Sequence, residues 1–314
     1  MNTTPITTRF FKRALPLAPY VLCFLLLVGS NSFREVAITN GLVQIVLFLL
    51  VVNIPAFLTK RMSYVDIGWP WGLVAIGVIT LILGDGYWLR KVIICVLYAL
   101  AGLRMGVFAV KMYLKGHLKQ ELPRYAYQRK RWEKGGYQSL DISLQYEVSI
   151  QSIANITFLA LPAMFQAFNS TPYLTPVELL GYGIWVLSFG TEHLADLQKV
   201  RFARKAHSEG RKGACCDVGL WKYSRHPNYF AEWMVWNALI LSSLPSVFFI
   251  YEKEPLWVWA GLSVGLLFIS RLLYLTLVYY TGAIPSEYYS LQKRPEYKSY
   301  QQRTNMFFPG RNRP

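Results

Sequence analysis

The sequence is poor in metal-binding residues and in acidic residues. Its 314 residues include four cysteines, four histidines and 17 acidic side chains, against 33 basic ones. Cys215 and Cys216 are adjacent, and no set of cysteines and histidines has the spacing of a zinc site. Four histidines are also too few for the multi-histidine di-iron centre of membrane desaturases and hydroxylases. We therefore expect no metal in this protein.

The two common nucleotide-binding loops are also missing. Gly181 and Gly183 form a Gly-x-Gly, but no strand precedes them and no helix start follows, so a Rossmann site is excluded. No phosphate-binding loop of the nucleoside-triphosphatase type occurs in the chain. Small residues inside an apolar run more often let two helices approach closely.

Apolar residues dominate the composition of the chain. They make up 54% of the chain and charged residues 16%, and the mean hydropathy is +0.27, which is too apolar for a soluble domain of this length. A helix needs about 20 apolar residues to cross a membrane, so about eight transmembrane helices are expected. The runs are 14–30, 37–58, 65–83, 90–110, 147–168, 174–194, 229–250 and 256–281. The sequence predicts an all-α, polytopic integral membrane protein.

The basic residues lie in alternate loops of this pattern. The net charge is +16, and 27 of the 33 basic residues fall before the first run, after the second, fourth and sixth runs, or after the last. Positively charged loops mark the cytoplasmic side of a membrane protein. We therefore expect both termini in the cytoplasm of a bacterial inner-membrane or endoplasmic-reticulum protein. The charge indicates topology and membrane lipids as partners, and no nucleic acid.

One polar stretch stands out where the seventh apolar run begins. It is residues 219–232, with the sequence GLWKYSRHPNYFAE. Pro227 suits the first turn of a helix, so the predicted helix begins there and continues through Glu232. The free N–H groups of that turn, beside Arg225 and His226, favour a phosphate or a carboxylate. The alternative is a basic, aromatic-rich helix entry at the membrane surface.

Polar residues upstream and downstream add to this stretch. Glu192, Asp196 and Lys199 share one helix face, which could hold a ribose through its carboxylates and a phosphate through its lysine. A solvated pairing of these charges within the helix is the alternative. In the tail, Tyr297 and Tyr300 lie three residues apart on one face of a short predicted helix, which could instead rest on anionic lipid.

Three motifs in this order resemble one known family. They are residues 192–199, residues 219–232 and residues 294–309. They are similar to the steroid 5-alpha-reductase C-terminal domain and sterol reductase superfamily, in particular its largely uncharacterised bacterial-type branch. The match is specific over 190–314, the expected cofactor-binding part. It is loose over 1–146, the N-terminal helices and a cytoplasmic loop of what we expect to be a single membrane domain, 1–314.

The resemblance implies an oxidoreductase. Members of the superfamily hold NADPH in a pocket that faces the cytoplasm and reduce an activated carbon–carbon double bond of a lipid or steroid-like substrate by hydride transfer. Carried over to this chain, the expected cofactor-binding residues are Asp196, Lys199, Trp221, Arg225, His226, Asn228, Tyr229, Glu232, Tyr297 and Tyr300. Arginine and lysine suit the phosphates, tryptophan can stack on a ring, and Asn228 can bond the carboxamide.

Reduction of such a bond also needs an acid directed at the developing enolate oxygen. Steroid 5-alpha-reductases use a carboxylic acid and a tyrosine from their N-terminal half. That pair has no residue-by-residue match here, which weakens the case for a steroid substrate. Tyr229, Glu192 and Asp66, in that order, are the candidate catalytic residues.

Two other functions fit the same motifs. Isoprenylcysteine and phospholipid methyltransferases, which use S-adenosylmethionine, carry a similar Arg-His-Pro-x-Tyr segment, although Asn228 and Glu232 favour the reductase. A non-enzymatic membrane protein that binds lipid is the third possibility, and the intact charged motifs argue against it. The sequence leaves the lipid-like substrate and the oligomeric state open.

Overall fold

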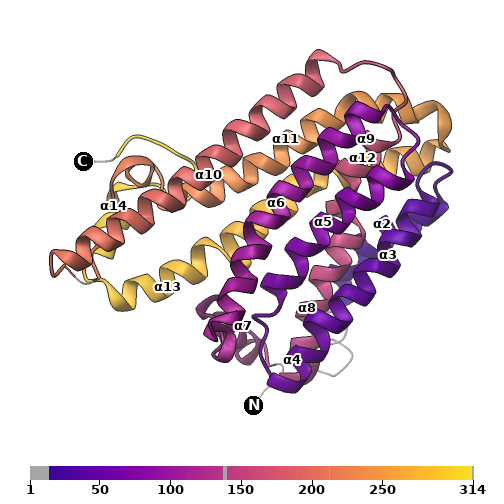
Figure 1. Cartoon of the computed structure of the whole chain (residues 1–314). Helices are drawn as coiled ribbons and strands as arrows, with labels where there is room; N and C mark the ends of the chain where they lie inside the picture. Colours follow the sequence, from indigo (N-terminus) through magenta and orange to yellow (C-terminus); the bar gives the residue numbers. More distant parts are fainter. Residues whose placement is uncertain (1–13, 137–139, 212, 313–314) are drawn as a thin grey trace. The chain divides into compact units, whose positions relative to one another are not determined.

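The computed structural model describes residues 14–136, 140–211 and 213–312. Every regular element in these residues is helical, which confirms the all-α prediction. The longer helices are labelled in Figure 1. They are α2 (Ala18–Gly29), α3 (Arg34–Phe48), α4 (Ile54–Thr59), α5 (Val65–Leu83), α6 (Trp88–Leu114), α7 (Pro123–Lys134), α8 (Leu140–Ile156), α9 (Leu161–Ala167), α10 (Pro176–Ser208), α11 (Pro227–Ile250), α12 (Leu256–Leu275), α13 (Ala283–Lys293) and α14 (Tyr297–Arg303).

Six helical segments of the described residues are long and apolar enough to cross a membrane. They are Arg34–Thr59, Val65–Leu83, Trp88–Leu114, Leu140–Ala167, Pro227–Lys253 and Leu256–Lys293. Each corresponds to one of the expected runs, and together they make the chain a multi-pass membrane protein. Short π-helical turns at Leu49–Asn53 and Thr276–Tyr280 lie within two of these segments.

The other two expected runs differ from the six. Leu15–Gly29 is an apolar helix of 15 residues, which is shorter than the roughly 20 residues that a crossing needs. Residues 174–194 form part of α10, which extends over 33 residues. Glu178, Glu192 and other polar residues interrupt its apolar sequence. The structure therefore shows six candidate spans where the sequence predicted about eight.

The described residues form two compact units, each with its own packing. The first unit takes in the described residues of 1–120, 139–175 and 243–268, and the second takes in those of 121–138, 176–242 and 269–314. In the first unit, α5 lies at the centre and packs against α3, α6 and α8. Gly102 of α6 allows the closest approach to α5, because a Cβ there would lie 2.4 Å from the Pro70 carbonyl oxygen.

Buried carboxamides join three helices of the first unit. Gln44 of α3 donates to the carbonyl of Gly72 in α5 at 2.9 Å, and Asn155 of α8 donates to the carbonyl of Trp69 at 3.0 Å. Asn40 completes the set with a bond to the Asn155 carbonyl at 3.1 Å. These amides lie within membrane spans, where water offers no alternative partner, so they fix the register of α3, α5 and α8.

Arg90 holds the loop that follows α9. Its side chain is fully buried, and its guanidinium donates to the carbonyls of Asn169 at 2.7 Å, Thr171 at 3.1 Å and Tyr173 at 2.6 Å. One planar guanidinium thus serves three carbonyls that have no regular secondary structure to satisfy them. The charge is paired with backbone dipoles that converge on it.

Arg90→Met should therefore destabilise the protein strongly. Three carbonyls would lose a charged donor, and each such bond contributes about 1.5–3 kcal/mol. We expect a clear drop in unfolding temperature in detergent, and little rescue by Arg90→Lys because an ammonium lacks the planar fork. Lys115→Met, at an exposed lysine beyond the end of the same helix, is the control. Equal unfolding temperatures for Arg90→Met and this control would contradict the assigned role.

Candidate functional site

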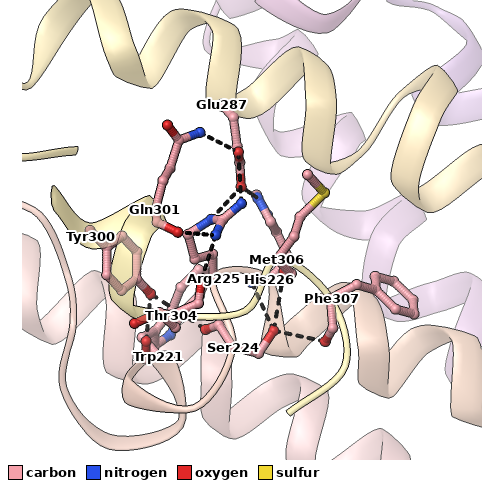
Figure 2. A network of polar contacts seen from close by, with 10 residues as sticks. All are labelled: Trp221, Ser224, Arg225, His226, Glu287, Tyr300, Gln301, Thr304, Met306 and Phe307. Atoms are coloured by element: carbon pink, nitrogen blue, oxygen red, sulfur yellow. Dashed lines mark hydrogen bonds and ion pairs between the residues drawn. The ribbon is translucent and has the colours of Figure 1, made fainter. Parts of the chain in front are cut away.

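The centre of the second unit is a buried ion pair between Arg225 and Glu287. Nε of Arg225 donates to one carboxylate oxygen of Glu287 at 2.7 Å and NH2 donates to the other at 3.1 Å. NH1 donates to the carbonyls of Gln301, at 3.0 Å, and Thr304. Figure 2 shows the guanidinium between the Glu287 carboxylate and these tail carbonyls. At least four of the five N–H groups of Arg225 are thus used inside the protein.

His226 is the third member of this network. It is buried, and its Nε2 lies 3.1 Å from the Glu287 carboxylate. Burial lowers the pKa of His226, and the bond to Glu287 opposes this only in part. The imidazole is therefore neutral at pH 7, and it must carry its proton on Nε2 to donate to the carboxylate. Gln301 adds a further donor to the same carboxylate at 2.6 Å.

The C-terminal tail is hydrogen-bonded to the segment that precedes α11. The backbone N–H of Arg225 donates to the Asn305 carbonyl at 2.9 Å, and the Ser224 hydroxyl donates to the Phe307 carbonyl at 2.8 Å. The Tyr300 hydroxyl donates to the Trp221 carbonyl, as Figure 2 shows. These bonds and the Arg225 network place the tail against the segment that precedes α11.

Trp221 connects this segment to α10. Its indole N–H donates to the carbonyl of Ala195 at 2.9 Å, and the Lys199 ammonium lies 4.2 Å from the centroid of its ring. Gln198 accepts a bond from the backbone of Leu220 at 2.9 Å. Gly219 has φ of +59°, and a Cβ there would lie 2.6 Å from the Gln198 side chain, so the turn requires glycine.

Lys199 and Arg294 form a region of positive charge beside Trp221. Burial lowers the pKa of the half-buried Lys199, and the nearby Arg294 guanidinium lowers it further. Within the described residues, neither side chain makes a hydrogen bond or an ion pair with a carboxylate. The Asp196 carboxylate is near enough to offset part of this effect on the pKa of Lys199. Two neighbouring cations without an ion-pair partner favour an anion such as a phosphate.

The side-chain amide of Asn228 has a hydrogen-bond partner for its NH₂ group but, among the described residues, none for its oxygen. It lies in the first turn of α11, and its amide N–H donates to the Asp196 carboxylate of α10 at 3.1 Å. Its carbonyl oxygen Oδ1 is buried and finds no hydrogen-bond partner among the described residues. A buried acceptor without a partner costs about 1–3 kcal/mol, which a donor supplied by a ligand would recover.

The remaining expected residues lie around these groups. Tyr229 stacks on His226, with ring centroids 5.3 Å apart and planes 6° from parallel. Glu192 is buried one turn before Asp196, and Glu232 is half-buried one turn after Asn228.

The two tail tyrosines form a cluster of their own, and Asp66 belongs to the first compact unit. Tyr297 and Tyr300 are buried in a cluster with Cys215, and burial raises the pKa of both tyrosines, so they stay neutral. Asp66 is in the first turn of α5, in the other compact unit.

Sequence reasoning missed Glu287 and Arg294 as site residues. Arg294 begins the third motif of the resemblance, but only Tyr297 and Tyr300 of that motif were taken as site residues. Glu287 lies outside the three motifs, and its spacing does not distinguish it from a solvated charge. The only signal in the sequence was indirect. A buried arginine needs a carboxylate partner, and Glu287 is one of only 17 acidic residues that could serve Arg225. The predicted start of the helix at Pro227 is confirmed.

Comparison with known proteins identifies a family without a described function. The model of the family called "Protein of unknown function (DUF1295)" matches residues 52–304. The chain belongs to this family. No curated protein and no solved structure matches it significantly. The match covers the whole Arg225 network and the Asn228 region, so these features lie in the part of the chain that defines the family.

Glu287→Gln should destabilise the second unit. Removing one charge of a buried pair leaves the other uncompensated, at a cost of about 3–5 kcal/mol. We expect a lower unfolding temperature in detergent than for Glu296→Gln, which changes an exposed glutamate in the same tail. If both variants unfold at the wild-type temperature, the network does not hold the tail.

His226 should make stability depend on pH. Above pH 6.5, the ordinary pKa of histidine, His226 is neutral in both the folded and the unfolded protein. Below that pH the unfolded chain takes up a proton that the buried imidazole resists, so stability falls as the pH drops from 6.5 towards 5. The unfolding temperature of His226→Gln should fall less steeply over this range. An identical pH dependence in both proteins would rule out His226 as the cause.

Proposed function

We propose that the protein is a membrane-embedded, NADPH-dependent reductase that transfers hydride to an activated C=C bond of a lipid or steroid-like substrate. The buried, unpaired Oδ1 of Asn228 carries this proposal. It lies where the resemblance expects the nicotinamide carboxamide, whose NH₂ group is the donor that Oδ1 lacks. The family of the chain is itself related to the steroid 5-alpha-reductases.

The residues around Asn228 fit the rest of such a cofactor. Asp196 holds the Asn228 amide and so directs Oδ1 away from α10. Lys199 and Arg294 offer two cations to the phosphates, and Trp221, fixed by its bond to Ala195, keeps Lys199 in place. NADPH, when bound, supplies the hydride, and the protein supplies orientation and charge.

The sequence predicts that Arg225 and His226 contact the cofactor directly. We propose a different role for them. Their polar groups already bond to Glu287 and the tail, so we assign them as positioning residues. They hold the segment before α11 and thereby the first turn that carries Asn228. Tyr297 and Tyr300 fasten the tail over the same segment.

Tyr229 is the proposed proton donor to the substrate. It follows Asn228 directly, and its stacking on the neutral His226 ring fixes its orientation beside the cofactor-binding turn. Glu192 and Asp66 remain the second and third candidates.

The charge pattern supports a cytoplasmic site. The basic residues between Lys199 and Arg225 precede the span that begins at Pro227, and basic loops favour the cytoplasm. This arrangement needs α10 and the helix at residues 15–29 to enter the membrane besides the six apolar spans. With 33 residues, α10 is about 50 Å long, enough to cross. We therefore propose eight membrane helices with both termini cytoplasmic.

Ligand binding tests this function directly. Purified full-length protein is titrated with NADPH, NADH and S-adenosylmethionine, and the unfolding temperature is followed because a ligand of the folded state raises it. We expect stabilisation by NADPH in preference to the other two. Stabilisation by S-adenosylmethionine alone, or by none of the three, would contradict the reductase.

Asn228→Ala should weaken NADPH binding by about tenfold to a hundredfold, the worth of one buried hydrogen bond. Asn237→Ala is the matched control, because Asn237 lies on the same helix and donates to the Trp233 carbonyl at 2.7 Å. Equal NADPH affinity in the two variants would remove Asn228 from the site.

A further inference from the structure

A surface groove lies in the first unit, where α4 packs against α8. A groove of about 540 Å³ runs along α8, and Leu17 and Phe57 form its other walls. Ile150 and Ile153 line its inner part, while Asp141 lies at its outer end. The groove is thus mostly apolar, although Gln145, Tyr146 and Ser149 also line it, and it is charged at one end. Figure 1 labels the two helices that border it.

The length of the groove matches one leaflet of a membrane. Its lining residues on α8 extend from Asp141 to Ile153, and twelve helical steps of 1.5 Å give roughly 18 Å. Half of a hydrocarbon core of about 30 Å is about 15 Å. Asp141 is the second residue of the span Leu140–Ala167, and Lys60 directly follows the span Arg34–Thr59. The charged end therefore lies at the level of the lipid headgroups.

An exposed ion pair occupies this charged end. The Lys60 ammonium lies 2.8 Å from the Asp141 carboxylate, and the two side chains are 45% and 48% exposed. An ion pair this exposed contributes little to stability, because water competes for both charges. Each charge can therefore exchange its partner for an opposite charge on a ligand at little cost.

Lys60 is held in an unusual backbone conformation. It ends α4 with φ of 57° and ψ of 31°, and it is the only described residue other than glycine with a positive φ. Glycine is the usual residue at such a helix end, because a side chain there is strained. Its ammonium also lies 4.3 Å from the centroid of the Phe57 ring, at the wall of the groove. Strained residues of this kind concentrate at functional sites, so the conformation of Lys60 indicates a functional side chain.

We propose that the groove binds one phospholipid with a phosphoethanolamine headgroup. Its phosphate pairs with Lys60, its ammonium pairs with Asp141, and one acyl chain lies along Ile150 and Ile153. The alternating charges of this headgroup complement the ion pair. A phosphatidylglycerol offers Asp141 no cation, and the quaternary nitrogen of a choline has no N–H to donate. This proposal is independent of the NADPH site.

Native mass spectrometry of the full-length protein tests the proposal. The protein is released from detergent with equal amounts of phosphatidylethanolamine, phosphatidylcholine and phosphatidylglycerol of one acyl composition. We expect a single retained lipid, with phosphatidylethanolamine favoured by up to about fivefold, the effect of one exposed charged contact. Equal retention of the three lipids by the wild-type protein would overturn the proposal.

Two variants separate headgroup recognition from folding. Lys60→Gly should abolish the preference for phosphatidylethanolamine while the unfolding temperature stays equal or rises, because glycine relieves the left-handed strain. Lys115→Gly, at another exposed lysine beyond a span, should keep the preference. Ile150→Trp fills the groove and should reduce retention of all three lipids, whereas Leu100→Trp on the exposed face of α6 should not. An unchanged preference in Lys60→Gly would contradict the assignment.

Discussion

The Arg225–Glu287 ion pair is the interaction on which the second unit depends. A guanidinium and a carboxylate that are both removed from water must satisfy each other, and here His226, Gln301 and the Thr304 carbonyl complete their hydrogen bonding. Residues 225 and 287 are 62 positions apart, so the pair connects the start of α11 to α13. Because the tail carbonyls bond to the same guanidinium, α14 and the residues after it are fixed by the same contact.

This arrangement separates the residues that hold the site from the residues that face a ligand. Arg225 and His226 have their polar groups directed into the protein, whereas Asn228, Lys199 and Arg294 retain unused bonding capacity. The first turn of α11 stands between the two groups, with Pro227 marking its beginning. In the proposed NADPH site, the unsatisfied acceptor on this turn would bind the carboxamide, and the two cations of the same unit would bind the phosphates.

Much of the fold follows from the sequence, and much of the site does not. Apolar length placed the spans at 65–83 and 227–253 closely, because a membrane sets the length of a crossing helix. Apolar length did not distinguish residues 174–194 from the six candidate spans, although Glu178 and Glu192 interrupt this apolar run in α10. The motif around Pro227 and Asn228 could be recognised because its residues follow one another in the sequence. The partnership of Arg225 with Glu287 depends on a contact between distant segments, which no local pattern specifies.

The most direct test of the central ion pair is hydrogen exchange of the backbone amides in the C-terminal tail. Wild-type protein and the Glu287→Gln variant are compared in the same detergent. Slow exchange of residues 297–310 in the wild type, and much faster exchange of these residues in the variant, is the result that the account predicts. Equal exchange of the tail in the two proteins would contradict it.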